Sequence, residues 1–219
     1  MKAIMISVKP KWCALIMNGE KTIEVRKNKA LANAIQKLID ENRYADIYVY
    51  CSKDKKHKLE YCDIGNGCWC ANDGGDYYNG KVVFKFRCYK VEEIPNYGLA
   101  RRSEIMMEGL LKKSCLNLQE LNEYAPHKEY EDDSIYAIHI SDLEIFNKPK
   151  ELNEFNPLKK TECDVCRRRN GIIYCPTCYE NIGSGCIQPL TKAPQNFCYI
   201  EGDKYYEINW KESKWFVRA

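Results

Sequence analysis

The stretch Ser7-Val-Lys-Pro-Lys-Trp12, running on to Gly19-Glu-Lys-Thr-Ile-Glu-Val-Arg26, decides the fold predicted for this chain. Apolar residues alternate before it and within its second part, as they do in strands with one buried face. The buried positions would be Ile4, Ile6 and Val8 in the first strand, and Ile23 and Val25 in the second. Between the strands, Pro10 suits the first turn of a helix and Gly19 suits a left-handed C-cap. The stretch therefore predicts a strand, a short helix and a second strand.

The opposite faces of these two strands carry ionic groups. The residues on them are Met5, Ser7 and Lys9 on the first strand and Thr22, Glu24 and Arg26 on the second, with Lys21 at its entrance. Charged residues on a half-buried strand are usually solvated, and Glu24 with Lys9 or Arg26 could form a weak surface ion pair. Alternatively, two adjacent strands would present a hydroxyl, a carboxylate and several cations to one ligand.

The composition indicates an ordinary soluble globular protein with mildly basic charge. The chain has 219 residues, 45% of them hydrophobic and 30% charged, which is enough for one core or a core with a small appendage. Its net charge of +3 is too low for indiscriminate coating of nucleic acid. We therefore expect any contact with nucleic acid to be local.

Neither a signal peptide nor a membrane-spanning segment is predicted from the sequence. The first residues lack a basic segment and a cleavage site, and no run approaches the roughly 20 apolar residues that cross a bilayer. We therefore expect a cytoplasmic (intracellular) protein with no membrane partner, whose thiols stay reduced. Its 13 cysteines then indicate metal ligands or buried thiols rather than disulfides.

Apolar periodicity and turn residues predict the other elements. They are a helix at 31–39, a strand at 45–51, an irregular loop at 62–75, one long curved strand at 81–94, helices capped by Ser103 and by Asn117 with Glu120, and a strand at 135–140. From Asn147 onward, Pro149 and Pro157 indicate a linker. We expect three regions: a main domain at 1–150, a Cys-rich insertion at 157–188, and a tail at 189–219 that returns to the main domain as strands.

Two Cys-x-x-Cys pairs predict a structural zinc site in the insertion. They are Cys163 with Cys166, and Cys175 with Cys178. Four thiolates satisfy tetrahedral zinc and leave no open position, and metal binding would supply the folding energy of so short a segment. The alternative is four reduced thiols in a mobile loop.

The remaining cysteines fit no ligand pattern. Cys62, Cys68 and Cys70, with Cys51 or His57, could make a second metal site, but we interpret them as buried or incidental thiols. Three more lie in apolar stretches and are expected in the core: Cys13, Cys88 and Cys115.

The opening stretch, Ser-x-Lys-Pro-Lys followed by Gly-Glu-Lys-Thr-x-Glu-x-Arg, resembles the signature of the ASCH domain, a relative of the PUA-type RNA-binding barrels. Supporting segments are Tyr78-Asn-Gly-Lys-Val-Val83, residues 134–140 followed by Asp142-Leu143, and residues 193–199. The resemblance covers residues 1–150 and the tail. It implies an α+β fold, a PUA-like mixed β-barrel with flanking helices, to which the zinc knuckle would be an insertion.

The resemblance also implies a binding function for the ionic groups. ASCH domains carry a charged cleft at the positions of Ser7, Lys9, Lys21, Glu24 and Arg26. Such a cleft would bind RNA or a modified nucleobase or nucleoside, the cations meeting phosphate or carbonyl groups and the carboxylate accepting from an exocyclic amine. A base could stack on Tyr136 or Trp12, although each could equally be a core residue. The knuckle would add a second phosphate-contacting surface or, in a third interpretation, a site for a protein partner.

An amidohydrolase is the alternative activity. Small ASCH-like proteins that deacylate acetylcytidine use a Lys, a Thr three residues later and a Glu before a later helix. Here Lys21 matches the Lys, but Glu24 stands at the Thr position and the Glu position falls near Ser114. If the protein is an enzyme, Lys21 and Glu24 would be its catalytic residues, but a carboxylate cannot replace a hydroxyl nucleophile without a change of mechanism. Hydrolysis therefore ranks second to binding.

Overall fold

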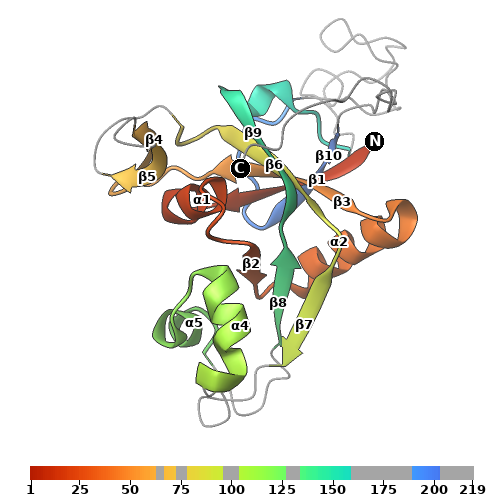
Figure 1. The fold of residues 1–219 in the computed structure, drawn as a ribbon. Coiled ribbons are helices and arrows are strands. Elements are labelled where there is room, and N and C mark those ends of the chain that lie inside the picture. The colour runs from red at the N-terminus through yellow and green to blue at the C-terminus, as the bar shows by residue number, and fades with distance from the viewer. Residues whose placement is uncertain (63–66, 73–77, 96–103, 127–133, 159–188, 203–219) are drawn as a thin grey trace, which may run out of the picture.

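A five-stranded sheet forms the centre of the protein (Figure 1). The computed structural model describes residues 1–62, 67–72, 78–95, 104–126, 134–158 and 189–202. In sheet order, the strands are β10 (Phe197–Glu201), β1 (Lys2–Val8), β3 (Ala45–Cys51), β6 (Val82–Cys88) and β9 (Ser141–Lys150). Strands β1 and β3 pair in parallel and the other pairs are antiparallel, so the sheet is mixed.

Both faces of this sheet are buried. Helices α1 (Pro10–Met17) and α2 (Lys29–Asn42) cover one face, where Ile4 and Ile6 pack against Ile16 and Ile35. On the other face, Met5 is fully buried in a second cluster, so its expected place on a polar face is wrong. A strand covered on both sides loses its alternation of apolar and polar residues.

A second sheet continues the first through a bent ribbon. It contains β2 (Ile23–Arg26), β8 (Ser134–His139) and β7 (Val91–Pro95), in the order β2-β8-β7. Strand β6 leads into β7 and β8 leads into β9, so the antiparallel pair β6–β9 continues as β7–β8 in the second sheet (Figure 1). The single strand expected at 81–94 is therefore divided at Tyr89 and Lys90, with register shifts in β6 on the way. Bulges of this kind turn a ribbon from one sheet to the next.

Helices α4 (Glu104–Ser114) and α5 (Leu118–Tyr124) pack on the second sheet, where Leu121 lies with Ile23 and Ile135 in a third apolar cluster. The predicted capping box is confirmed: Asn117 accepts from the Glu120 backbone N–H, and the Glu120 carboxylate accepts from the Asn117 N–H. The cap expected at Ser103 lies outside the described residues. With helices and mixed sheets together, the predicted α+β class is confirmed.

Residues 58–72 contain a β-hairpin at a place where an irregular loop was expected. Strands β4 (Lys58–Cys62) and β5 (Cys68–Asn72) pair in antiparallel and pack against α1. Asn18, the C-cap of α1, donates to the Trp69 carbonyl oxygen and accepts from the Trp69 N–H, each at 2.9 Å. The loop prediction was wrong because it relied on the Gly and Asn residues between the two strands. The alternating runs on either side, which are typical of strands, are only five residues long.

Residues 147–158 contain regular structure and a core residue where a linker was expected. Strand β9 continues to Lys150, and a 3-10 turn at Leu152–Glu154 leads to Phe155, which is buried in the second cluster. Strand β10 then pairs with β1. The Cys-rich segment at 159–188 and the end of the tail at 203–219 lie outside the described residues.

Cys13 and Cys88 lie in the core as expected, and burial raises the pKa of the Cys88 thiol to about 11. Cys115 is partly exposed, so its expected place in the core is wrong. Within the described ranges, no helix is both long enough and apolar enough to cross a bilayer.

Candidate functional site

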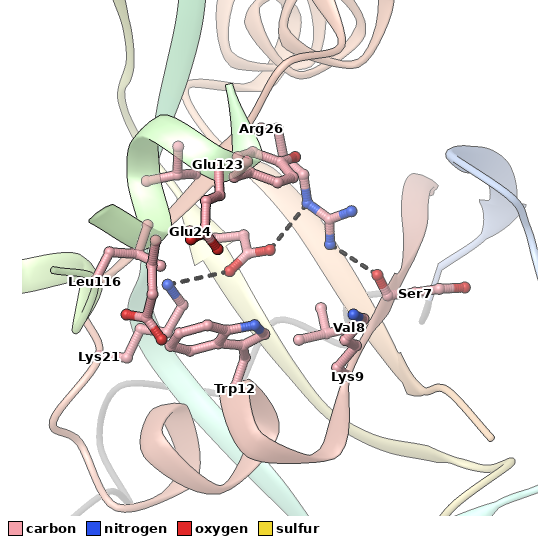
Figure 2. Close-up of a pocket in the computed structure, with 12 residues that line it drawn as sticks. Ser7, Val8, Lys9, Trp12, Lys21, Glu24, Arg26, Leu116 and Glu123 are labelled. Carbon is pink, nitrogen blue, oxygen red and sulfur yellow. Dashed lines mark hydrogen bonds and ion pairs between the residues drawn. The ribbon is translucent and has the colours of Figure 1, made fainter. Parts of the chain in front are cut away.

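A pocket of about 480 Å³ lies where the end of β1, the start of α1, β2 and α5 meet (Figure 2). Five of the six predicted ligand-binding residues line it together: Ser7, Lys9, Lys21, Glu24 and Arg26. The other lining residues are Val8, Trp12, Val25, Leu116, Glu120, Glu123 and Tyr124. The opening stretch thus supplies most of the pocket wall, and the segment 116–124 supplies the rest.

Local structure explains how the opening stretch reaches one pocket. Strand β1 ends at Val8 and α1 begins at Pro10, so Lys9 stands at the corner between them. Gly19 has a positive φ of 77° at the end of α1, and the backbone N–H of Lys21 donates to the Leu15 carbonyl oxygen at 3.0 Å. This turn brings β2, and with it Glu24 and Arg26, alongside the start of the helix.

The Glu24 carboxylate is buried between two cations. Its oxygens lie 3.3 Å from Lys21 Nζ and 2.9 Å from Arg26 Nε (Figure 2). Only 3% of Lys21 and 6% of Glu24 are exposed, so the interpretation of a weak surface pair is wrong. In this environment, an ion pair is screened far less than at the surface.

Backbone carbonyl groups hold both cations in place. Lys21 Nζ donates to the Ser114 carbonyl oxygen at 2.8 Å, and Arg26 Nη2 donates to that of Ser7 at 2.7 Å. Buried Arg26 Nε contacts Glu24 as an ion pair but has no aligned hydrogen-bond acceptor. The cations thus tie the α4 end and the β1 end to the same carboxylate.

Helix α5 adds groups that the sequence reasoning missed. Glu120 pairs with Lys11 at 2.8 Å, and this bond, with the Asn117 N–H, lowers the pKa of the Glu120 carboxyl. Burial raises the pKa of Tyr124, so its phenol is neutral near pH 7. The capping box predicts that Glu120 lies in the first turn of a helix. The sequence does not predict that this turn lies next to Lys11, about a hundred positions earlier.

The two predicted stacking residues differ in position. Trp12 lines the pocket, and its ring centroid lies 5.0 Å from Lys21 Nζ. Tyr136 is 5% exposed, lies outside the pocket lining, and donates through its hydroxyl to Glu93 at 3.3 Å. Only Trp12 is therefore placed to meet a ligand in the pocket.

A group that could hold a metal ion lies on the β4–β5 hairpin. Glu60, Cys62 and Cys70 have ligand atoms within 4.8 Å of one another, and Cys62 and Cys70 are joined by a disulfide. The expectation that Cys62 and Cys70 are reduced is therefore wrong, whereas Cys68 is a free thiol as expected. The four cysteines of the predicted zinc knuckle, Cys163, Cys166, Cys175 and Cys178, lie outside the described residues.

No family model and no curated protein matches this sequence. Among solved structures, ASCH from Zymomonas mobilis matches with 15% identity, a TM-score of 0.41, and coverage of 69% of this chain and 75% of that one. A point mutant of the same protein gives the same identity and coverage with a TM-score of 0.43. The N-terminal domain of Staphylothermus marinus McrB matches with 6% identity, a TM-score of 0.41, and coverage of 69% of this chain and 77% of that one. The first two carry the name of the family that the opening stretch resembles.

Proposed function

We propose that the protein binds RNA, or a modified nucleobase or nucleoside, by taking one base into the 480 Å³ pocket. The observation that carries this proposal is the Glu24 carboxylate, fixed between Lys21 and Arg26 on the pocket wall. A carboxylate has about four lone-pair sites, so it can accept from a ligand while it is paired with two cations. Exocyclic amines of bases donate to such a group.

The charges of the pocket favour a neutral base over a polyphosphate. The cations that line it are Lys9, Lys21 and Arg26, and the lining carboxylates are Glu24, Glu120 and Glu123. The formal charges of these six side chains cancel. Trp12 offers a flat apolar surface for stacking, and the exposed Lys9 at the pocket edge suits one backbone phosphate.

The test is binding by wild-type protein and by Glu24→Gln. The probes are the common ribonucleosides, acetylcytidine and a randomised pool of short single-stranded RNA, measured by calorimetry or by tryptophan fluorescence. We expect Glu24→Gln to bind about 10- to 100-fold more weakly, which corresponds to the roughly 1–3 kcal/mol of one well-aligned base contact. Glu41→Gln, an exposed carboxylate on α2, should bind like the wild type. Equal affinity for Glu24→Gln and wild type would refute the proposal.

The competing activity is removal of an acyl group from a nucleoside. The observation that favours it is the buried Lys21–Glu24 pair, which could serve as an acid and a base. The two hydroxyl groups nearest the expected catalytic positions are poorly placed, because Thr22 is exposed and Ser114 is fully buried, with its Oγ donating to the Leu111 carbonyl oxygen. The hydroxyl of Ser7, which lines the pocket, is bonded to the Pro194 carbonyl oxygen. Acetate release from acetylcytidine that is lost in Lys21→Ala would establish this activity instead of binding alone.

The Cys-rich insertion supports a separate proposal, structural zinc held by Cys163, Cys166, Cys175 and Cys178. The arginines at 167–169 would then offer phosphates a second surface, or a protein partner a docking site. We expect about one zinc ion per chain in protein purified without added reductant, and less in Cys175→Ser, measured by elemental analysis. If the purified wild-type protein contains no metal, the proposal of a zinc site in the insertion is wrong. If Arg168→Glu abolishes capture of a protein while RNA affinity is unchanged, the insertion is a protein-interaction site.

A further inference from the structure

The two faces of the β4–β5 hairpin have different chemistry. On the inner face, Leu59 is fully buried and Trp69 packs against the main core, with its ring 5.2 Å from that of Tyr61. Alternation along both strands sends the intervening side chains to the outer face. These are Glu60 and Cys62 on β4, and Cys68 and Cys70 on β5.

The register places these four side chains on one face, and the ligand atoms of three of them, Glu60, Cys62 and Cys70, lie within 4.8 Å of one another. Glu60 lies opposite Cys70 and Cys62 lies opposite Cys68. Directly opposed side chains have Cβ atoms about 4.5–5.5 Å apart. Cys62 and Cys70 form a disulfide across the diagonal, with Cα atoms 6.7 Å apart, and Cys68 is an exposed thiol that is not bonded to another cysteine. Three cysteine sulfurs and one carboxylate are thus presented on one face of one hairpin.

We propose that the hairpin, when its disulfide is reduced, binds one zinc ion through Glu60, Cys62, Cys68 and Cys70. Zinc takes four ligands in a tetrahedron, from thiolates at about 2.3 Å and carboxylate oxygens at about 2.0–2.2 Å. Tetrahedral ligand atoms at such distances lie about 3.5–3.8 Å apart, which agrees with the 4.8 Å limit that Glu60, Cys62 and Cys70 already satisfy. A thiolate-rich set also favours zinc over magnesium or calcium, which take oxygen ligands.

The disulfide and the metal exclude each other, since Cys62 and Cys70 serve in both. Reduction by a dithiol transfers two electrons and two protons to the Cys62–Cys70 bond, which gives two thiols, while the dithiol becomes a disulfide. Zinc binding then displaces the protons of the three thiols. Oxidation of Cys62 and Cys70 by a disulfide reverses the exchange and releases the ion.

The hairpin backbone is held independently of this group. The Asn18 side chain makes both of its bonds to the Trp69 backbone. Asn79 accepts from the Leu59 N–H at 2.8 Å and donates to the His57 carbonyl oxygen at 2.9 Å. Because these contacts involve none of the four proposed ligands, they persist in either redox state. The backbone that carries the four ligands is therefore held before the ion arrives, and the exposed Cys68 side chain, which lies outside the 4.8 Å group, turns toward the ion when it binds.

The test compares zinc content of the full chain in two redox states. Protein is oxidised, or reduced with a dithiol and freed of reductant, then equilibrated with zinc and desalted. We expect reduced wild type to hold about one more zinc ion per chain than reduced Cys70→Ser, a comparison in which any ion in the Cys-rich insertion is common to both proteins, and we expect oxidised wild type to lack that extra ion. Titration with cobalt(II) should give sulfur-to-cobalt charge-transfer absorption that includes a component present only after reduction.

Variants assign that extra ion to the hairpin. Cys70→Ser should lose the redox-dependent ion, whereas Cys198→Ser, a partly buried thiol on β10, should retain it. Glu60→Gln leaves all three thiols in place and should weaken zinc binding by about tenfold or more. Equal zinc content in both redox states of the wild type overturns the proposal, and so does a reduced Cys70→Ser protein that holds as much zinc as the reduced wild type. If Glu60→Gln binds zinc as tightly as the wild type does, Glu60 is not one of the ligands.

Discussion

Replacing Glu24 with alanine is expected to lower the free energy of unfolding by about 3 kcal/mol, because it leaves a buried ammonium unpaired beside a partly buried guanidinium. Lys21 is 3% exposed, and once the carboxylate is gone its ammonium keeps its bond to the Ser114 carbonyl oxygen and its contact with the Trp12 ring but has no counter-ion there. Urea unfolding, with an unchanged slope against denaturant, measures the loss.

Two variants show whether the stranded charge is the cause. Combining Lys21→Met with Glu24→Ala removes the ammonium and should recover part of the lost stability. Glu41→Ala breaks the exposed Lys37–Glu41 pair and should change stability by about 0.5 kcal/mol or less. If Glu24→Ala unfolds no more easily than Glu41→Ala, the Glu24 ion pair contributes nothing to the fold.

Phe155→Ala is expected to destabilise the protein by about 3 kcal/mol, as large-to-small changes in a packed core do. Phe155 is 6% exposed, and its ring packs edge-on against Tyr48 with centroids 5.4 Å apart. A linker residue would make no such contribution. Thermal or urea unfolding gives the value.

The matched control for Phe155 lies three residues later. Leu158 is 38% exposed, so Leu158→Ala should change the free energy of unfolding by about 0.5 kcal/mol or less. Similar values for the two variants would show that residues 151–158 lie outside the cooperative core, as a linker would.

The sequence was informative where one local pattern determines both structure and site. In the opening stretch, strand, helix and strand follow one another within 26 residues, so alternation and caps alone bring Lys9, Glu24 and Arg26 to one pocket. The closeness of Lys21 to Glu24 follows from the same turn. Their burial does not, because helix α5 and the end of α4 complete the wall from residues about a hundred positions away.

Local patterns failed where tertiary structure selects the partner. The apolar residues between 81 and 94 predict one long strand, yet the chain leaves the first sheet after Cys88 and enters the second at Val91. Periodicity predicts that a residue is buried, but it does not predict in which of the apolar clusters the residue lies. Met5 and Tyr136 were assigned to a polar face or a pocket for the same reason, and both are buried. The hairpin cysteines became recognisable as a group only after the β4–β5 register was known, since their spacing matches no metal-binding motif.

The pairing of β1 with β10 has a consequence for how the molecule forms. Lys2 lies opposite Glu201, and the Ser7 hydroxyl donates to the Pro194 carbonyl oxygen at 2.7 Å. Contacts between such distant parts of a chain raise contact order, which slows folding. During synthesis, one edge of β1 stays unpaired until β10 has left the ribosome. Over that interval, the exposed edge can pair with other chains, so shielding by a chaperone should raise the yield of folded protein.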